Sequence, residues 1–168
     1  MDKEGAKLDE FGRPYPPKCG DYYIPHIAAD AIVTRAHKDD SFHDILLITR
    51  GIEPNKGCLA FPGGHIDYNE APEKACVREL KEECGIDGTE PKLFTVRGDA
   101  NRDPRKHMIT IVYSVSVDPE ASYKAGDDAA TAEWYNLKNI MSEKKEKDFA
   151  FDHHSILSEF IDKNLSGY

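Results

Sequence analysis

Residues 63–86 constrain the fold more than any other stretch, because they combine an amphipathic helix with a concentration of acidic side chains. Their sequence is GGHIDYNEAPEKACVRELKEECGI. At about 100° per residue, one arc of this helix collects the apolar side chains Cys76, Val77, Leu80 and Cys84. Asn69 is a candidate N-cap, and Gly85 is a candidate residue for the C-terminal stop. The pattern predicts a helix that starts at residue 70 or 71, ends at residue 84, and packs its apolar arc on a core.

Three glutamates, Glu79, Glu82 and Glu83, fall on the neighbouring arc near the C-terminal end of this helix. Like charges three or four residues apart repel each other, and the helix dipole disfavours anions at this end. One interpretation is a solvated acidic face. The other is a site for a hard divalent cation, because the preceding Phe-Pro-Gly-Gly turn brings backbone oxygens close to these carboxylates. We favour the cation, since its charge would offset both unfavourable terms.

The same stretch resembles the Nudix box, a signature with fixed spacing between glycine, arginine, glutamate and aliphatic positions. The matching positions are Gly64, Glu70, Arg78, Glu79, Leu80, Glu82, Glu83, Gly85 and Ile86. The resemblance implies a Nudix α/β/α sandwich, in which a mixed central sheet lies between helices. It also implies hydrolysis of nucleoside diphosphates linked to another moiety, with Mg²⁺ (or Mn²⁺) as the cofactor.

The resemblance further assigns roles to individual residues. It implies that Glu79 and Glu83 bind the metal, with Glu82 close by and the Gly63 carbonyl contributing. It implies that Arg78 and Glu70 orient the helix and the loop rather than touch substrate. In the hydrolysis that the resemblance implies, the metal would neutralise the charge of the pyrophosphate and activate a water, and a carboxylate would accept the proton from that water.

The rest of the chain reads as one domain over residues 21–168, preceded by an irregular arm over residues 1–20 that is rich in proline and glycine. Runs of β-branched and apolar residues predict strands over 26–35, 44–50, 92–99, 108–117 and 132–137. Residues 149–165 carry apolar side chains at the spacing of a second amphipathic helix. Strands mixed with helices in this way indicate an α/β or α+β domain.

Two further stretches resemble the ADP-ribose pyrophosphatase branch of the family. One is the basic loop 97–106, with an Asp-Pro-Arg sequence before the long strand; the other is the Gly-Asp-Asp-Ala loop before the strand that contains tryptophan. Arg102, Arg105 and Lys106 could bind a diphosphate or a terminal ribose. The alternatives are a solvated loop, or a salt bridge of Arg105 that shapes the turn. Arg50 could reach the phosphates from the end of its strand.

Acids and aromatic residues outside the box leave alternatives open. Asp127 and Asp128 are candidates for a further metal ligand or a base, although aspartate is also common in turns. Tyr22, Tyr23 and Phe61 could stack on adenine, or belong to the core. Two adjacent histidines, 153 and 154, point in different directions from a helix start, so we interpret them as structural rather than metal-binding.

The composition of the chain limits the kinds of partner that the protein is expected to bind. The net charge of −9 disfavours general binding to nucleic acid or to an anionic membrane. No stretch is long and apolar enough for a membrane span, the N-terminus lacks the features of a signal peptide, and the four cysteines show no paired spacing. We therefore expect a cytoplasmic protein with reduced thiols, a small-molecule nucleotide as its partner, and no nucleic acid or membrane partner. A homodimer is possible.

Three functions remain in competition. The first is an ADP-ribose pyrophosphatase that gives AMP and ribose 5-phosphate. The second is a Nudix hydrolase of other nucleotides, such as an oxidised dNTP or a nucleotide sugar. The third is a non-catalytic ADP-ribose sensor, which the complete set of box glutamates disfavours.

Overall fold

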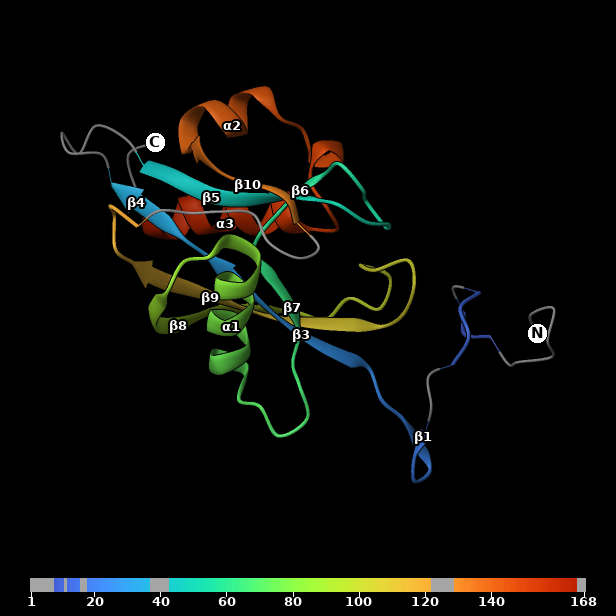
Figure 1. Ribbon diagram of the computed structural model, residues 1–168. Helices are drawn as coiled ribbons and strands as arrows, with labels where there is room; N and C mark the ends of the chain where they lie inside the picture. The colour runs from blue at the N-terminus through green and yellow to red at the C-terminus, as the bar shows by residue number, and fades with distance from the viewer. Residues whose placement is uncertain (1–7, 11, 16–17, 37–42, 122–128, 166–168) are drawn as a thin grey trace.

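Two four-stranded sheets form the centre of the protein, in a computed structural model that describes residues 8–10, 12–15, 18–36, 43–121 and 129–165 (Figure 1). The first sheet has the order β7 (Gly63–His65), β3 (His26–Ile32), β9 (Met108–Val117) and β8 (Gly88–Arg97). Its β3 and β9 strands run parallel and its other pairs are antiparallel, so the sheet is mixed. The second sheet contains β10 (Ala129–Asn136), β5 (His43–Arg50) and β4 (Thr34–Ala36), with β6 (Leu59–Ala60) also paired to β5.

Helices lie on both sides of these sheets. They are α1 (Pro72–Cys84), α2 (Leu137–Glu143) and α3 (His153–Asn164), with a short 3₁₀ turn, η1 (Glu146–Asp148), before α3. In Figure 1, α1 crosses in front of the strands and α3 lies behind them. The expected α/β/α sandwich with a mixed sheet is therefore confirmed.

Alternation along the strands decides which helix each side chain meets. On β5, Leu46 and Ile48 belong to the hydrophobic cluster that contains the buried face of α1. Ile45 and Leu47 belong to the cluster formed with α2 and α3. Because successive side chains of a strand point to opposite faces, one strand supplies both cores. This explains why the middle of β5, residues 45–48, is apolar at every position instead of alternating with polar residues.

The helix α1 begins later than the sequence predicts. Its N-cap is Ala71, which makes no capping hydrogen bond from its side chain, and Pro72 occupies the first turn. The prediction of Asn69 as the N-cap is wrong: Asn69 has φ 66° and belongs to the turn before the helix. Gly85 is confirmed as the stop, because it has φ 71° and its amide donates to the Lys81 carbonyl.

The predicted strand over residues 26–35 is divided between the two sheets. The division falls at Val33, whose carbonyl accepts the Leu46 amide at 3.0 Å. The chain therefore leaves β9 and pairs with β5 from Thr34 onward. Residues 108–117 and the strand near 44–50 agree with prediction, whereas β8 begins at Gly88 and β10 ends at Asn136, since Leu137 already starts α2.

The N-terminal arm contacts its own domain. Arg13 donates to the carbonyls of Ala100 and Asp103 at 2.6 and 3.0 Å. A small hairpin follows, formed by β1 (Lys18–Cys19) and β2 (Tyr22–Tyr23), and it projects from the end of β3 (Figure 1). The proposed boundary at residue 20 therefore falls within a hairpin, and residues on its arm side contact the basic loop.

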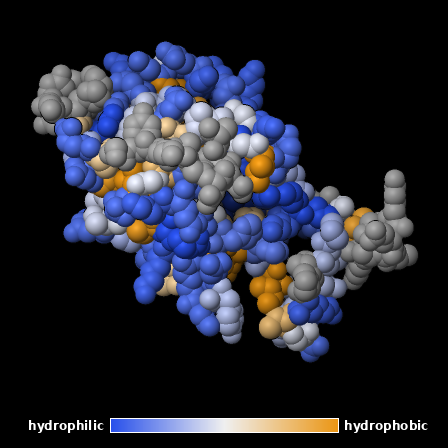
Figure 2. Space-filling view, in the orientation of Figure 1, coloured by the Kyte–Doolittle hydropathy of each residue, from blue (hydrophilic) through white to orange (hydrophobic). Residues whose placement is uncertain are grey.

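The visible face of the protein is largely hydrophilic (Figure 2). Within the described ranges, no helix is long and apolar enough to span a membrane. The cysteines that face the α1 core, Cys76 and Cys84, are fully buried, and burial raises the pKa of each thiol to about 12. Both cysteines therefore act as small apolar side chains in the core.

We predict that Gly85→Ala destabilises the protein by about 1 kcal/mol, because a Cβ is unfavourable in the left-handed conformation that ends α1. Urea unfolding followed by circular dichroism measures the change. The matched control is Gly98→Ala, where an added Cβ would meet Ile109 only at ordinary van der Waals distance, 3.6 Å. Equal stability of the two variants would contradict the assignment.

Candidate active site

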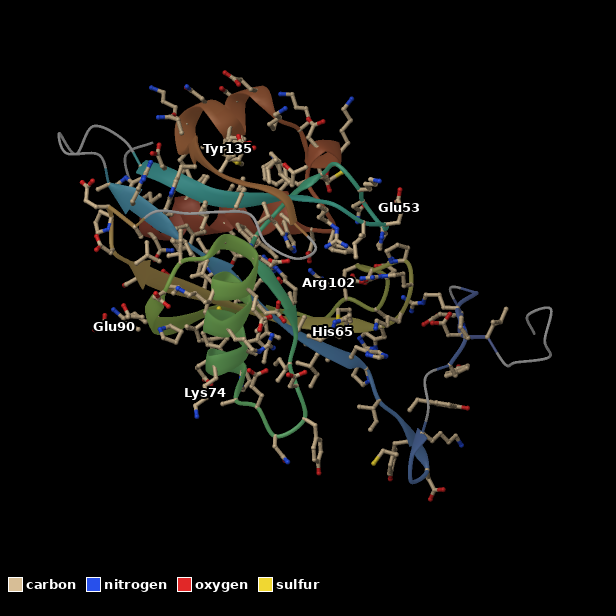
Figure 3. The ribbon with its side chains drawn as sticks, in the orientation of Figure 1. Glu53, His65, Lys74, Glu90, Arg102 and Tyr135 are labelled. Atoms are coloured by element: carbon tan, nitrogen blue, oxygen red, sulfur yellow. The ribbon has the colours of Figure 1, made fainter. Side chains whose placement is uncertain are left out.

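A cavity of about 380 Å³ opens where β3, β5 and β7 meet α1 and the loops that precede β9 and α3. Charged residues of both signs line it. The acidic ones are Asp30, Asp67, Glu79, Glu83 and Asp103, and the basic ones include Arg50, Arg102 and Arg105. His65 and Arg102, labelled in Figure 3, belong to two different elements that border the cavity. The structure thus gathers most of the sequence-predicted residues around one space.

Two glycines on β7 let the acidic side chains come close. The Gly63 amide donates to Glu83 Oε2 at 2.9 Å. A Cβ on Gly64 would stand 2.5 Å from the Glu79 carboxylate, and a Cβ on Gly63 would collide with Asp30. Any larger residue at either position would therefore have to displace a carboxylate, which gives a steric reason for the paired glycines.

Arg78 connects α1 to the turn before it. Its Nε and Nη2 donate to the two Glu70 oxygens at 2.9 Å each, and Nη2 also donates to the His65 carbonyl at 3.0 Å. Its Nη1 donates to Glu79 at 2.8 Å and to Glu82 at 3.1 Å. These contacts agree with an orienting role for Arg78 and Glu70, because neither residue lines the cavity.

Glu82 is placed differently from the other two box glutamates. Its carboxylate lies on Arg78, its side chain is 45% exposed, and it does not line the cavity. Glu83, in contrast, is 8% exposed. The helix therefore brings Glu79 and Glu83 to the cavity and leaves Glu82 at its outer edge.

Burial changes the protonation of the inner carboxyls. Burial raises the pKa of Glu83 to about 8, and the nearby charges of Glu79 and Asp30 act in the same direction. Burial also raises the pKa of Glu79, although the hydrogen bond from Arg78 opposes this effect. A cation between these groups would remove the penalty, because opposite charge favours the ionised form.

These carboxylates suit a hard divalent cation, but they do not form a complete protein cage. Within the part of the chain that the structure describes, no three histidine, cysteine, aspartate or glutamate side chains are grouped for a metal. Mg²⁺ commonly binds through one or two carboxylates and takes its remaining ligands from water and substrate phosphates. The pair Glu79 and Glu83, beside the Gly63–Gly64 turn, fits that manner of binding.

Two of the cavity arginines are already paired. Arg102 is 5% exposed and donates to Asp152 at 2.5 Å through Nη2. Arg105 binds the buried Asp103 through its own amide, Nε and Nη2 at 2.8, 3.1 and 2.8 Å. The alternative that Arg105 forms a turn-shaping salt bridge is therefore what the contacts show, and Arg105 still borders the cavity.

Arg50 differs, because within the described ranges it forms no ion pair with a carboxylate. Its Nε donates to the Pro54 carbonyl at 2.9 Å, and its guanidinium lies 5.2 Å from the centre of the Phe151 ring. The other arginines of the chain each have a carboxylate partner: Arg13, Arg35, Arg78, Arg97, Arg102 and Arg105. A cation without a counter-ion at the edge of a cavity is available to an anionic ligand.

His65, which lines the cavity, belongs to a group formed with Lys106 and His26. Lys106 Nζ lies 3.3 Å from His26 Nδ1 and 3.1 Å from His65 Nε2. An ammonium only donates, so both ring nitrogens accept and both imidazoles are neutral in this arrangement. Burial and the charge of Lys106 lower the pKa of both histidines, in agreement with that assignment.

Some predicted residues lie elsewhere. Asp127 and Asp128 are outside the described residues. Tyr22 and Tyr23 do not line the cavity: Tyr22 is 79% exposed, and Tyr23 packs on Tyr15 with 4.2 Å between ring centres. Phe61 is 1% exposed in the cavity floor and stacks on His153. The core alternative therefore describes Phe61, and the two tyrosines belong to neither the cavity nor the core.

Sequence reasoning missed Asp30, Phe151 and His153 as cavity residues. Asp30 could have been suspected, because it is a charged residue inside an otherwise apolar strand, and buried charges need a partner or a function. The sequence pattern indicates a structural role for His153, and the residue is indeed buried, but it also borders the site. Phe151 has φ 52°, a backbone conformation that no sequence pattern here indicates.

Comparison with known proteins agrees with the geometry. The model of the family described as NUDIX domain matches residues 24–160. The chain is 39% identical over 140 residues to an ADP-ribose pyrophosphatase from Methanocaldococcus jannaschii, a match that covers 83% of this chain and 75% of that protein. It is 31% identical over 141 residues to the ADPR responsive transcriptional repressor NtrR of Acinetobacter baylyi, covering 83% of this chain but only 54% of the repressor.

Solved structures show the same fold. A MutT/nudix family protein from Enterococcus faecalis superposes with a TM-score of 0.75 at 26% identity, covering 88% of this chain and 66% of that one. The NUDIX domain of Shewanella oneidensis NrtR, solved with ADP ribose, gives a TM-score of 0.75 at 21% identity, covering 88% of this chain and 93% of that domain.

The raised pKa of Glu83 predicts a pH effect on the metal-free protein. The folded state holds a proton up to about pH 8, whereas the unfolded state releases it near the ordinary value of 4.5. Stability from this group is therefore present below about pH 4.5 and is lost as the pH rises toward 8. The urea midpoint of unfolding, measured in EDTA, should fall more between pH 5 and pH 8 for wild type than for Glu83→Gln. Parallel curves for the two proteins would refute the shift.

Proposed function

The chain belongs to the family with a NUDIX domain and is a Nudix pyrophosphohydrolase, and we propose that its substrate is ADP-ribose or a closely related nucleoside diphosphate derivative. The products would be AMP and ribose 5-phosphate. The similar protein from M. jannaschii is named an ADP-ribose pyrophosphatase. We further propose Mg²⁺ (or Mn²⁺) as the cofactor, since Nudix hydrolases generally need divalent metal ions.

The observation that carries this proposal is the position of Arg50. It lines the same cavity as Glu79 and Glu83, and its guanidinium has no carboxylate partner within the described ranges. A diphosphate would contribute a negative charge for Arg50, and metal held by Glu79 and Glu83 would bind its other oxygens. An arginine and a metal site that share one cavity suit a doubly charged group better than a neutral ligand.

Each remaining residue has a task in hydrolysis. When bound, the metal would neutralise phosphate charge and lower the pKa of an attacking water. Glu79 and Glu83 would hold it, with the Gly63 carbonyl nearby and Glu82 at the outer edge. Arg78 keeps Glu79 in place, because it donates to that carboxylate at 2.8 Å. A carboxylate must then accept the proton, and Asp127 and Asp128 remain candidates for that step.

The basic loop would bind the part of the substrate beyond the metal. Arg102 and Arg105 are fixed by Asp152 and Asp103, so little side-chain entropy would be lost when they contact a phosphate or a ribose. We propose that both residues orient the substrate and that Arg50 contributes more binding energy. Their existing ion pairs already neutralise much of their charge.

A sensor without catalysis is the second candidate. The similarity to the A. baylyi repressor supports it, although this chain spans about half the length of that protein. The complete set of box glutamates, Glu79, Glu82 and Glu83, favours the enzyme. We also propose a cytoplasmic location, a small-molecule partner without nucleic acid, and a homodimer as a possible assembly.

The substrate is tested by phosphate release through a coupled phosphomonoesterase in the presence of Mg²⁺. The panel is ADP-ribose, NADH, diadenosine polyphosphates, 8-oxo-dGTP and ADP-glucose, with direct pyrophosphate detection for the triphosphate. We expect ADP-ribose to be preferred and Glu83→Gln to reduce kcat by at least about a hundredfold, because the metal loses a buried ligand. Tight ADP-ribose binding without turnover would favour the sensor, and preference for another compound would overturn the substrate assignment.

The role of Arg50 is tested by Arg50→Ala, for which we expect KM for ADP-ribose to rise about tenfold or more with a smaller fall in kcat. Arg105→Ala should raise KM less, because Arg105 is already paired with Asp103. Arg97→Ala is the matched control, since Arg97 pairs with Glu159 and does not line the cavity. An unchanged KM in Arg50→Ala would remove Arg50 from the substrate site.

A further inference from the structure

His153 is the first residue of α3 and is 3% exposed, yet it borders the catalytic cavity. Its ring stacks on Phe61 with 4.9 Å between ring centres. Its Nδ1 accepts the Phe61 backbone amide at 3.1 Å. The imidazole therefore connects α3 to the segment that joins β6 and β7. Phe61 in this segment precedes His153 by 92 residues in the sequence, although the two are in contact in space.

These contacts determine which nitrogen of His153 carries the proton. The Phe61 amide can only donate, so Nδ1 must present its lone pair, and a neutral ring then carries its proton on Nε2. Nε2 faces Asp30 Oδ2 at 3.8 Å. Burial lowers the pKa of His153, which keeps the ring neutral. The Nε2–H tautomer thus satisfies the amide on one side and directs an N–H toward a carboxylate on the other.

Asp30 is itself held in place. Thr110 donates from Oγ1 to Asp30 Oδ2 at 2.5 Å. On the next strand, Gly63 lies against Asp30 so closely that a Cβ there would collide with its carboxylate. The position of Asp30 therefore limits the position of Gly63.

Side chains from two helices hold the segment between Phe61 and His65. His153 accepts the Phe61 amide, Glu83 accepts the Gly63 amide at 2.9 Å, and Arg78 donates to the His65 carbonyl at 3.0 Å. Arg78 and Glu83 come from α1, whereas His153 comes from α3. The backbone also holds this segment, because the Ala31 amide donates to the Pro62 carbonyl at 2.8 Å. Loss of the His153 contact would leave the Phe61 amide without its acceptor.

We propose that His153 is a positioning residue for the hydrolytic site: through Nδ1 it fixes the segment from Phe61 to Gly63, and so it sets the place of the Gly63 backbone and of the Glu83 carboxylate bound to it. The effect on catalysis rests on the proposed function, because it acts on the residues proposed to hold the metal. The contacts of His153 with Phe61 and Asp30 do not depend on that function.

Two substitutions separate the two ring nitrogens. In His153→Asn, the side-chain oxygen can take the place of Nδ1 and accept the Phe61 amide. In His153→Gln, the amide group reaches the place of Nε2 and leaves the Phe61 amide without its acceptor. Both variants lose the stack on Phe61, so each controls for the packing change in the other.

The experiment measures three quantities. ¹⁵N NMR of the wild-type imidazole should show Nδ1 unprotonated and Nε2 protonated. Hydrogen exchange of the Phe61 amide should remain slow in His153→Asn and become fast in His153→Gln. Mn²⁺ affinity, from the free-ion EPR signal, should fall about 10- to 100-fold in His153→Gln and much less in His153→Asn, as expected for a residue that supports a metal ligand.

The opposite tautomer, or equal losses in the two variants, would overturn the proposal and leave His153 a packing residue. If wild-type protein binds no Mn²⁺ and hydrolyses no substrate of the panel, the proposed function fails. In that case the tautomer and the Phe61 exchange still decide whether His153 positions the segment. The two failures are therefore distinguishable.

Discussion

The rest of the site depends on the contacts that the Arg78 guanidinium makes. It contacts three carboxylates and one backbone carbonyl, from Glu70, Glu79, Glu82 and His65. Without this cation, like charges on one helix would repel each other at the end where the dipole is also unfavourable. Arg78 therefore lets α1 carry several acids, and it joins the helix to the β7 strand that borders the cavity. Burial raises the pKa of Glu83 to about 8, and the nearby charges of Glu79 and Asp30 add to this effect.

The fold supplies the geometry that this interaction needs. Because β5 contributes alternate side chains to both cores, helices can cover both sides of the strands. This places α1 on one side and α3 on the other, and both reach the segment between β6 and β7. The glycines at 63 and 64 let that segment lie against the carboxylates without collision. The acidic residues of the cavity thus lie where α1, α3 and the segment between β6 and β7 come together.

The arginines of the cavity are held in place in two different ways. Arg102 and Arg105 are held by Asp152 and Asp103, and the loop that carries them is held by Arg13 from the arm. Arg50 is oriented by a backbone carbonyl and an aromatic ring instead of a carboxylate. Among the described residues, Arg102 and Arg105 have carboxylate partners and Arg50 has none, so the site is ordered without being strongly repulsive before ligand arrives. Such preorganisation reduces the entropy lost when a ligand binds.

The sequence by itself determined the existence of the helix that ends at residue 84, its stop at Gly85 and most of the strands, because these follow from local periodicity. The sandwich class came from the resemblance to the Nudix box. The sequence also identified Glu79, Glu83 and the three arginines of the cavity. Only the tertiary structure decided that Glu82 turns outward onto Arg78, that Arg50 differs from the paired arginines, and that Asp30 and His153 join the site. These features depend on contacts between residues far apart in the chain, where spacing along the sequence carries no information about distance in space.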